Sequence, residues 1–257
     1  MIIGVDIGGT NVDVVAYDGE FIHVATYPTS KVANKLGDIL KDLVKKFEAE
    51  AVGIGFAGWI RNGKILKAPN VRFKLKLDLD VPYRIENDAN CFALFASRTF
   101  GFKNILGITV GTGVGSGIIF EGMIYRGLGL AGEIGHWFVF VDGKEICTCG
   151  GKGHLECYFG GWSFQSRGLS PEEIVKSGEI YKLSGFDIFC IAVANAIALL
   201  DPEAVIFGGR IGGNLNEEIL KERIYSYLMP EFRPVIKTLK DPLAVAKGAC
   251  LMMEVSP

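Results

Sequence analysis

Two glycine-rich turns of this chain have the composition of phosphate-binding loops, and they lie in segments that repeat each other. Residues 2–19 read IIGVDIGGTNVDVVAYDG, and residues 105–122 read ILGITVGTGVGSGIIFEG. The segments align without a gap, and each predicts an apolar strand, a tight turn, a second apolar strand and an acidic-Gly turn. Glycine lets the backbone approach a ligand, and successive N–H groups in such a turn form an anion-binding concavity. The repeat therefore predicts two half-folds that hold the phosphates of one nucleotide.

The first turn also carries a carboxylate, which phosphoryl transfer needs near its Mg²⁺ ion. The residues of this turn that could bind the phosphates or the metal are Asp6, Gly8, Gly9, Thr10 and Asn11. The second turn offers hydroxyls and small residues, namely Thr109, Gly111, Thr112 and Gly113. It is not a Rossmann fingerprint, because a strand is predicted to follow it, and no Gly-Lys-Ser/Thr is present to make a Walker P-loop. A plain glycine-rich hairpin is the alternative interpretation of a single turn, and the second copy argues against it.

A third glycine element, Gly208-Gly209, directly follows the predicted buried strand 204–207. Paired glycines there would let a flat base or a ribose lie against the backbone. An ordinary turn after a strand is the alternative.

Asp88 is the candidate general base. It lies between a predicted strand and a predicted helix, beside the polar residues Asn87 and Asn90. A general base must reach the hydroxyl whose proton it removes. The same position also suits an aspartate that caps a helix N-terminus, so both interpretations stay open on position alone.

A cluster of cysteine and histidine residues predicts a metal site. Two of the three histidines and three of the six cysteines lie within residues 136–157. In a reducing compartment such clustering points to metal rather than to disulfides, and four thiolate and imidazole ligands suit a structural Zn²⁺ ion. The predicted ligands are His136, Cys147, Cys149 and His154. Cys157 is the alternative fourth ligand, because it lies three residues after His154 and faces the same way if this piece is helical.

The composition predicts a cytoplasmic globular protein. The 257 residues carry a net charge of −2, which gives no electrostatic basis for a nucleic-acid partner. No targeting segment is visible, and the longest apolar stretch, Phe186 to Leu200, falls short of the roughly 18–20 residues that span a bilayer. Small-molecule ligands are therefore expected, with no membrane partner.

Strands and helices alternate along the chain, which predicts an α/β architecture in two similar lobes. Strands are expected at 52–56, 83–86, 204–207 and 234–238, and helices at 34–48, 89–99, 187–200, 216–228 and 243–254. The lobes should meet at a cleft lined by strand ends and glycine turns, where ligands bind in such sheets.

Together these features resemble the ROK (repressor, open reading frame, kinase) family of sugar kinases over essentially the whole chain. The matching segments are the loop Gly111–Gly117, the pair Asn87-Asp88, the run Glu133–His136 and the run Cys147–Glu156. The resemblance implies the duplicated actin-like (ribonuclease H-like) ATPase fold. Its small lobe would comprise residues 1–99 and 244–257, with the first phosphate turn and the catalytic aspartate. Its large lobe, residues 100–243, would carry the second phosphate turn, the zinc site and the nucleotide.

The resemblance also implies a sugar site. Asp88 would be the catalytic base, and the residues around the sugar would be Gly58, Asn87, Asp88, Glu133, His136 and Glu156. His136 would bind zinc through one ring nitrogen and face the sugar with the other. Three positions depart from the family pattern: His154 replaces a cysteine, Asn11 a frequent lysine or arginine, and Ala57 a usual proline.

The expected activity is an ATP-dependent sugar kinase that transfers the γ-phosphate of ATP to a sugar hydroxyl, with Mg²⁺ and a structural zinc ion. The C6 hydroxyl of glucose is the preferred acceptor, and N-acetylmannosamine and N-acetylglucosamine are the alternatives. A non-catalytic sugar sensor and an actin-like filament protein are further alternatives. The intact Asp88 and both phosphate turns argue against the sensor, and the zinc cluster argues against the filament. A homodimer is expected from the resemblance and from the frequency of symmetric oligomers.

Overall fold

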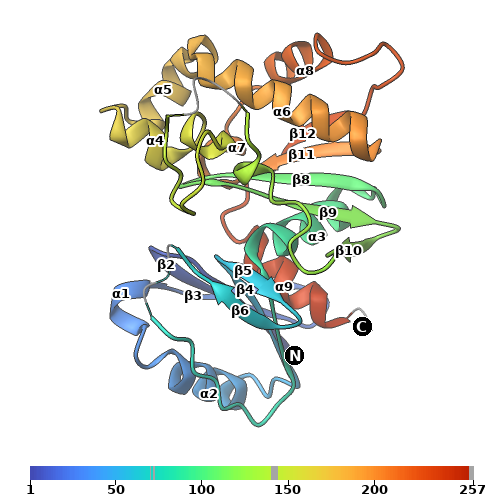
Figure 1. Ribbon diagram of the computed structural model, residues 1–257. Coiled ribbons are helices and arrows are strands. Elements are labelled where there is room, and N and C mark those ends of the chain that lie inside the picture. The colour runs from blue at the N-terminus through green and yellow to red at the C-terminus, as the bar shows by residue number, and fades with distance from the viewer. Residues whose placement is uncertain (70, 72, 140–143, 255–257) are drawn as a thin grey trace.

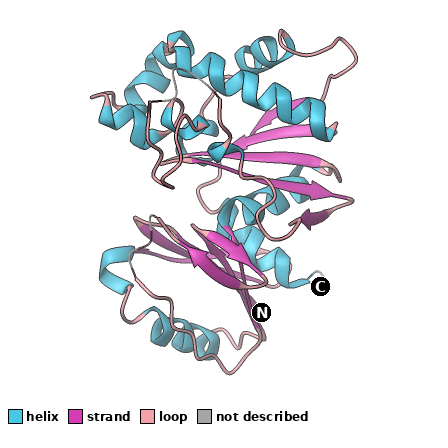
Figure 2. Ribbon diagram, in the orientation of Figure 1, coloured by secondary structure: helices cyan, strands magenta, loops and turns pink. Residues whose placement is uncertain are grey.

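The two halves of the chain form two five-stranded sheets that have the same strand arrangement (Figures 1 and 2). This computed structural model describes residues 1–69, 71, 73–139 and 144–254. The first sheet has the order β3-β2-β1-β4-β7, with β1 Ile2–Ile7, β2 Asn11–Tyr17, β3 Phe21–Pro28, β4 Ala51–Phe56 and β7 Tyr83–Asn87. The second has the order β10-β9-β8-β11-β12, with β8 Ile105–Val110, β9 Val114–Phe120, β10 Met123–Tyr125, β11 Ala204–Gly208 and β12 Val235–Thr238.

Strand directions match between the sheets. In each half the first three strands form an antiparallel meander, and the first strand then pairs in parallel with a strand from the α/β part of that half. The repeated sequences occupy equivalent places, because β1–β2 and β8–β9 are the hairpins that carry the two glycine turns. The predicted α/β duplication is therefore confirmed.

Helices cover the outer faces of both sheets (Figure 1). The longest, α6, contributes Phe186, Phe189 and Val193 to the core of the second half. The α-helices are α1 Thr29–Val32, α2 Leu36–Lys46, α3 Asp88–Phe100, α4 Gly161–Ser166, α5 Pro171–Ser177, α6 Ser184–Leu200, α7 Gly209–Gly212, α8 Glu217–Tyr225 and α9 Ala244–Glu254. Short 3₁₀ turns are η1 Ile134–His136, η2 Leu155–Cys157 and η3 Glu179–Lys182. None of the helices in the described part of the chain combines the length and the apolar character that crossing a bilayer requires.

Helices α3 and α9 join the two halves, and each lies against the sheet of the opposite half (Figure 1). Helix α3 follows the first sheet but packs its Phe92, Ala93 and Ala96 with residues of β8, β9 and β11. Glycine allows the close packing: a Cβ on Gly53 of β4 would lie 1.8 Å from the carbonyl oxygen of Ala249, in α9. A Cβ on Gly248 would lie 1.9 Å from the carbonyl oxygen of Cys91, in α3. The crossed helices therefore form one packed layer between the sheets.

A small two-stranded sheet, which the sequence did not predict, projects from the first half. It consists of β5 Trp59–Arg61 and β6 Lys64–Lys67, paired antiparallel. Ile60 anchors it in the core of the first half, where its side chain is only 5% exposed.

Candidate active site

One cavity of about 1100 Å³ is lined by residues of both halves, and most of the site residues predicted from the sequence meet there. The predicted residues that line it are Asp6, Gly8, Gly9, Thr10, Asn11, Gly58, Asn87, Asp88, Thr109, Gly111, Thr112, Gly113, Glu133, His136, Glu156 and Gly209. The strand ends, hairpin turns and helix starts of both sheets supply most of these residues, and the turns η1 and η2 supply Glu133, His136 and Glu156.

The two glycine turns occupy equivalent places on opposite lobes of this cavity. In the first, the N–H of Gly8 donates to the Asn11 carbonyl at 3.0 Å. In the second, the N–H of Gly111 donates to the Gly113 carbonyl at 3.0 Å. Gly113 has a further constraint, because a Cβ there would lie 2.6 Å from Oε2 of Glu156. The second turn therefore packs directly against a carboxylate from the sugar-site candidates.

Gly208 and Gly209 have different structural roles. Gly208 does not line the cavity; a Cβ on it would lie 2.1 Å from the ring of Phe92, so this glycine permits packing of β11 on α3. Gly209 lines the cavity and has φ +78°, a conformation that glycine adopts without strain. Arg210, Asn214 and Lys240 also line this end, and the sequence reasoning did not single them out.

Carboxylates give the cavity its electrostatic character. Burial, and then the charges of Asp88 and Asp13, raise the pKa of Asp6 well above its usual value. Burial also raises the pKa of Asp88 to about 6, against the opposing effect of backbone N–H donors. Burial first and the charge of Asp88 second raise the pKa of Glu133 to about 7. Ionisation of these buried carboxylates costs free energy, and a bound cation would offset that cost. The cavity therefore favours the binding of a cation.

The end of β7 and the start of α3 place Asp88 at the cavity. Asn87 is the N-cap: its Oδ1 accepts from the N–H groups of Ala89 at 2.9 Å and Asn90 at 3.2 Å. The alternative in which Asp88 is the N-cap is therefore wrong. Asp88 is the first residue of the helix, and its Oδ1 accepts from the adjacent N–H of Ala89 at 3.0 Å. The carboxylate keeps acceptor capacity for a ligand.

A buried glutamate that the sequence reasoning missed supports this corner. Glu86 is only 5% exposed, and its Oε1 accepts from the N–H of Asn87 and from Nδ2 of Asn90, both at 2.9 Å. Its Oε2 accepts from Nε of Arg126, in the second half, at 2.5 Å. The signal was present in the sequence, because Glu86 directly precedes the Asn87-Asp88 pair. The network ties the catalytic candidate to both lobes.

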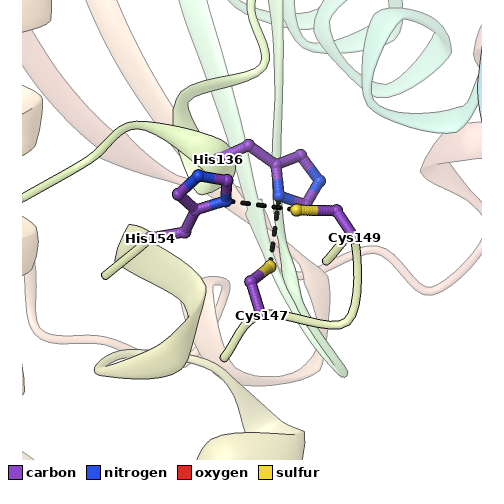
Figure 3. A group of neighbouring side chains, drawn as sticks. All are labelled: His136, Cys147, Cys149 and His154. Carbon is purple, nitrogen blue, oxygen red and sulfur yellow. Dashed lines mark hydrogen bonds between the residues drawn. The ribbon is translucent and has the colours of Figure 1, made fainter. Parts of the chain in front are cut away.

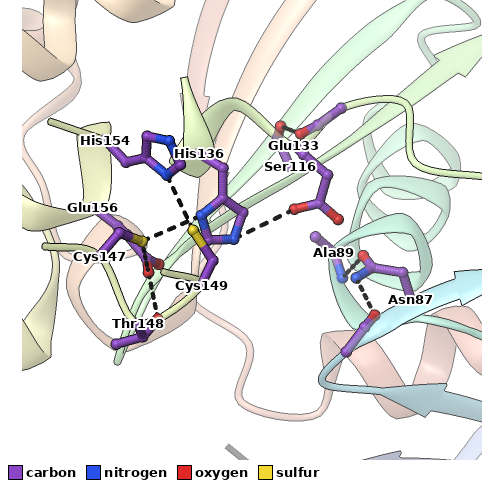
Figure 4. A network of polar contacts seen from close by, with 12 residues as sticks. Asn87, Ala89, Ser116, Glu133, His136, Cys147, Thr148, Cys149, His154 and Glu156 are labelled. Carbon is purple, nitrogen blue, oxygen red and sulfur yellow. Dashed lines mark hydrogen bonds and ion pairs between the residues drawn. The ribbon is translucent and has the colours of Figure 1, made fainter. Parts of the chain in front are cut away.

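The segment that carries Glu133 and His136 lies flat against β9. Ser116 of β9 donates its hydroxyl to the Gly132 carbonyl, immediately before Glu133. A Cβ on Gly135 would lie 2.0 Å from the Val114 carbonyl oxygen, so only glycine lets the segment approach so closely. Glu133 and His136 are thereby held at the cavity wall, where Glu133 Oε2 lies 3.9 Å from Nε2 of His136 (Figure 4).

The four predicted metal ligands converge on one point (Figure 3). Their ligand atoms all lie within 4.8 Å of one another. Nδ1 of His136 is 3.5 Å from Sγ of Cys147, and Nδ1 of His154 is 3.2 Å from Sγ of Cys149. Zinc–ligand bond lengths at a tetrahedral angle place nitrogen and sulfur about 3.6 Å apart, so the donor atoms fit zinc in both type and spacing.

Of the two candidates for the fourth ligand, His154 lies within this group, whereas the group does not include Cys157. Cys157 is buried in a small apolar cluster with Tyr158 and with Cys147, so it contacts one ligand of the group without belonging to it. Local sequence explains the placement of His154: a Cβ on Gly151 would lie 2.2 Å from its ring, so glycine is required at that turn.

Glu156 connects the metal group to the cavity (Figure 4). It is only 6% exposed, and its Oε1 accepts from the hydroxyl of Thr148 at 2.9 Å and lies 3.1 Å from Sγ of Cys147. His136 makes a second connection, since its Nδ1 faces the metal group and its Nε2 faces Glu133. An ion at this group would therefore orient two side chains that line the cavity.

Comparison with known proteins identifies the chain. A sequence model of the ROK family matches residues 2–244. The chain belongs to the ROK family of sugar kinases. The N-acetyl-D-glucosamine kinase of Photobacterium profundum is 31% identical to this ROK kinase over 299 aligned positions, covering 98% of this chain and 99% of that protein. The glucokinase of Thermotoga maritima is 28% identical, with coverage of 96% and 94%.

Solved structures agree with this assignment. The ROK hexokinase from Thermus thermophilus superimposes with a TM-score of 0.81 at 25% identity, and 98% of each chain is covered. A ROK family glucokinase from Streptomyces griseus, solved with glucose and AMPPNP, gives a TM-score of 0.74 at 27% identity over 98% of each chain. The expected actin-like ATPase fold and the activity class, an ATP-dependent sugar kinase, are confirmed.

Proposed function

We propose that this ROK kinase transfers the γ-phosphate of ATP to a hydroxyl of N-acetylglucosamine. This revises the substrate preference expected from the sequence, which was glucose. Relatives named N-acetyl-D-glucosamine kinase from Photobacterium profundum and Vibrio cholerae are 31% and 30% identical, ahead of the Thermotoga glucokinase at 28%. These names favour the amino sugar that the sequence reasoning held as an alternative.

Asp88 takes the proton of the attacking hydroxyl in this proposal. The position of Asp88 supports its assignment as the base. Asp88 lines the cavity at the N-terminus of α3, and Asn87, not Asp88, is the N-cap of that helix. A pKa of about 6 suits a base near neutral pH, because most of the groups are ionised yet still attract a proton. Proton removal supplies about 10²–10⁴-fold in rate, and alignment of the reactants supplies more.

The two glycine turns hold the triphosphate between the lobes. Backbone N–H groups of residues 8–11 and 111–113 would receive phosphate oxygens, with the hydroxyls of Thr10, Thr109 and Thr112 beside them. Asp6 is the residue for Mg²⁺, directly or through water, since its buried carboxylate faces the cavity and resists ionisation without a cation. Mg²⁺ bound there supplies positive charge to the phosphates. The ribose and base are expected along Gly209.

The sugar lies among carboxylates and an imidazole in this proposal. Its partners are Gly58, Asn87, Glu133, His136 and Glu156, together with Asp88. Carboxylates that receive sugar hydroxyls impose sharp selection, because an analogue without the hydroxyl leaves a buried charge unpaired. His136, Cys147, Cys149 and His154 would hold a structural zinc ion in a four-ligand shell. Such an ion would fix the orientation of His136 and of the neighbouring Glu156.

Glucose is the second candidate. The Thermotoga relative is named glucokinase, and the Streptomyces glucokinase was solved with glucose bound. A pocket that accepts an equatorial hydroxyl at C2 differs from one that accepts an acetamido group mainly in volume. Measurement of kcat/KM for each sugar therefore decides which of the two is the preferred substrate.

We retain the proposed lobe boundaries, which are residues 1–99 with 244–257 for the small lobe and residues 100–243 for the large lobe.

We also propose that the protein forms a homodimer. Exposed apolar side chains around the edge strand β10 support it: Phe120, Met123, Tyr125 and Leu128 are 52–88% exposed. Exposed apolar groups at a sheet edge mark association surfaces. Sedimentation equilibrium measures the mass directly, and a monomer at micromolar concentration would contradict this part.

The test of function is a panel of hexoses and N-acetylhexosamines, with ATP and Mg²⁺ and coupled detection of ADP. The highest kcat/KM is expected for N-acetylglucosamine, with glucose second. Binding of sugar without ADP formation would contradict the kinase assignment and support a sugar sensor. ADP formation that does not depend on sugar would support an ATPase instead.

A further inference from the structure

The small β5–β6 sheet places Trp59 in the wall of the cavity, beside His136 of the proposed sugar site, and no motif in the sequence assigns a role to this sheet. We propose that this hairpin is a clasp over the sugar end of the cleft, and that Trp59 is the residue of the clasp that contacts the sugar and determines its binding. The inference rests on the proposed function and adds a binding residue to it.

The base of the hairpin is fixed to the catalytic corner. Gly58, which precedes β5, accepts a hydrogen bond at its carbonyl from Nδ2 of Asn87 at 3.0 Å. A Cβ on Gly58 would lie 2.7 Å from the Lys67 carbonyl oxygen, so glycine lets the two strands close at this end. Trp59 pairs with Lys67 across the hairpin. A movement of the hairpin would therefore displace Asn87, the neighbour of Asp88.

The base of the hairpin, at Lys67, and its strand β5, at Arg61, both contact the other half of the molecule. Nζ of Lys67 donates to the carbonyl of Cys149, in the metal segment, at 3.2 Å. On the other edge, a Cβ on Gly129 would lie 3.0 Å from Cα of Arg61, so the loop after β10 is in close contact with β5. These contacts join a strand pair rooted in the first half to two loops of the second. The hairpin therefore bridges the cleft rather than lining one side of it.

Trp59, at the base of the hairpin, contacts the sugar-site candidates. Its ring lies edge-on to the ring of His136, with 5.5 Å between centroids and 80° between planes. Its indole N–H donates to the carboxylate of Glu133. Nζ of Lys67 lies 5.3 Å from the Trp59 ring centroid, which makes a cation–π contact on the same side chain. Trp59 thus touches two residues assigned to the sugar while lining the cavity itself.

The chemistry of an indole suits a pyranose. A pyranose presents an apolar C–H face and a rim of hydroxyls, and an indole presents a flat apolar ring and one N–H donor. With the clasp shut, Trp59 both covers the ring and orients the Glu133 carboxylate that would receive a hydroxyl.

Intrinsic fluorescence tests the inference apart from activity. The chain has three tryptophans, at positions 59, 137 and 162. Titration of the wild-type protein with N-acetylglucosamine, and with glucose, should change its emission. Trp59→Phe should abolish the change, and Trp162→Phe should retain it. Retention of the full change in Trp59→Phe would overturn the inference.

Steady-state kinetics give the second readout. Trp59→Ala should raise the KM for the sugar about tenfold or more, the effect of losing roughly 1.4 kcal/mol of binding. The kcat and the KM for ATP should stay near wild type, whereas a merely structural role would lower stability without this selectivity. Lys67→Met should raise the sugar KM in the same direction, and Lys64→Met, at the turn of the same hairpin, should not.

The two hypotheses fail differently. If the wild type phosphorylates sugar and Trp59→Ala keeps the wild-type sugar KM, the proposed role of Trp59 is wrong and the assignment as a sugar kinase is unaffected. If the wild type neither binds nor phosphorylates any hexose of the panel, both are wrong.

Discussion

Replacement of Asp88 by asparagine should lower kcat by about 10² or more and, at the same time, stabilise the protein. The folded protein raises the pKa of this carboxyl from 3.8 to about 6, mainly by burial. A raised pKa in a carboxyl means that its ionisation costs stability, and this cost is absent below the unfolded pKa and complete above the folded one. A shift of about 2 units corresponds to about 3 kcal/mol at 1.36 kcal/mol per unit. That is an upper limit, because the side chain faces the cavity and keeps part of its hydration.

Asparagine keeps the acceptor that receives the Ala89 N–H, so the local hydrogen bond survives the substitution. Removal of the charge also lowers the pKa of Asp6 and Glu133, since Asp88 contributes to raising both. Guanidinium unfolding of nucleotide-free and magnesium-free protein should show a gain of up to about 3 kcal/mol at pH 8 and less than about 1 kcal/mol at pH 4. Asp18→Asn, in the exposed turn after β2, controls for a simple loss of surface charge.

Turnover of the same Asp88→Asn protein is measured with ATP and N-acetylglucosamine, and sugar binding by fluorescence. Binding should persist while kcat falls by about 10² or more, as expected for loss of a general base. A variant that is no more stable than wild type at pH 8 would refute the electrostatic reasoning. A variant with near wild-type kcat would refute the assignment of Asp88 as the base.

Four further outcomes are expected. The kcat/KM of the wild type should fall about tenfold per pH unit below pH 6, where Asp88 is protonated; a profile that is flat down to pH 5 would contradict the assigned base. Arg126→Met leaves the buried Glu86 without its partner, so chemical denaturation should show a loss of about 2 kcal/mol and kcat should fall, whereas Arg126→Lys should recover part of both. Cys149→Ser should lower the zinc content measured by mass spectrometry together with the melting temperature, and unchanged values of both would exclude the metal site. Gly248→Ala should destabilise the protein by about 1–3 kcal/mol in thermal unfolding, because its new Cβ meets the carbonyl of Cys91 in α3.

The duplication could be predicted because it is written in the sequence as an ungapped repeat. Glycines and apolar residues recur at the same spacing, and the structure places them in equivalent hairpins, β1–β2 and β8–β9. The metal group could also be predicted, because cysteine and histidine side chains gathered in a short segment of a reduced protein are typical of a metal site. Each hairpin, and the metal group, is built from residues that are close together in the sequence.

Contacts between distant segments could not be predicted in the same way. Sequence alone does not say that Arg126 reaches Glu86, or that Lys67 reaches the carbonyl of Cys149. The two residues of each pair lie in different lobes, and their meeting depends on how α3 and α9 set the lobes against each other. The packing contact of Gly208 could not be predicted for the same reason, since its neighbour is the ring of Phe92 on α3.

The central claim is that two equivalent turns hold one triphosphate so that its last phosphate meets a sugar beside Asp88. The direct measurement is a crystal structure with a non-hydrolysable ATP analogue, Mg²⁺ and N-acetylglucosamine. It should show one sugar hydroxyl within hydrogen-bond distance of the Asp88 carboxylate and in line with the γ-phosphorus. A sugar bound away from Asp88, or phosphates that contact only one of the turns, would contradict it.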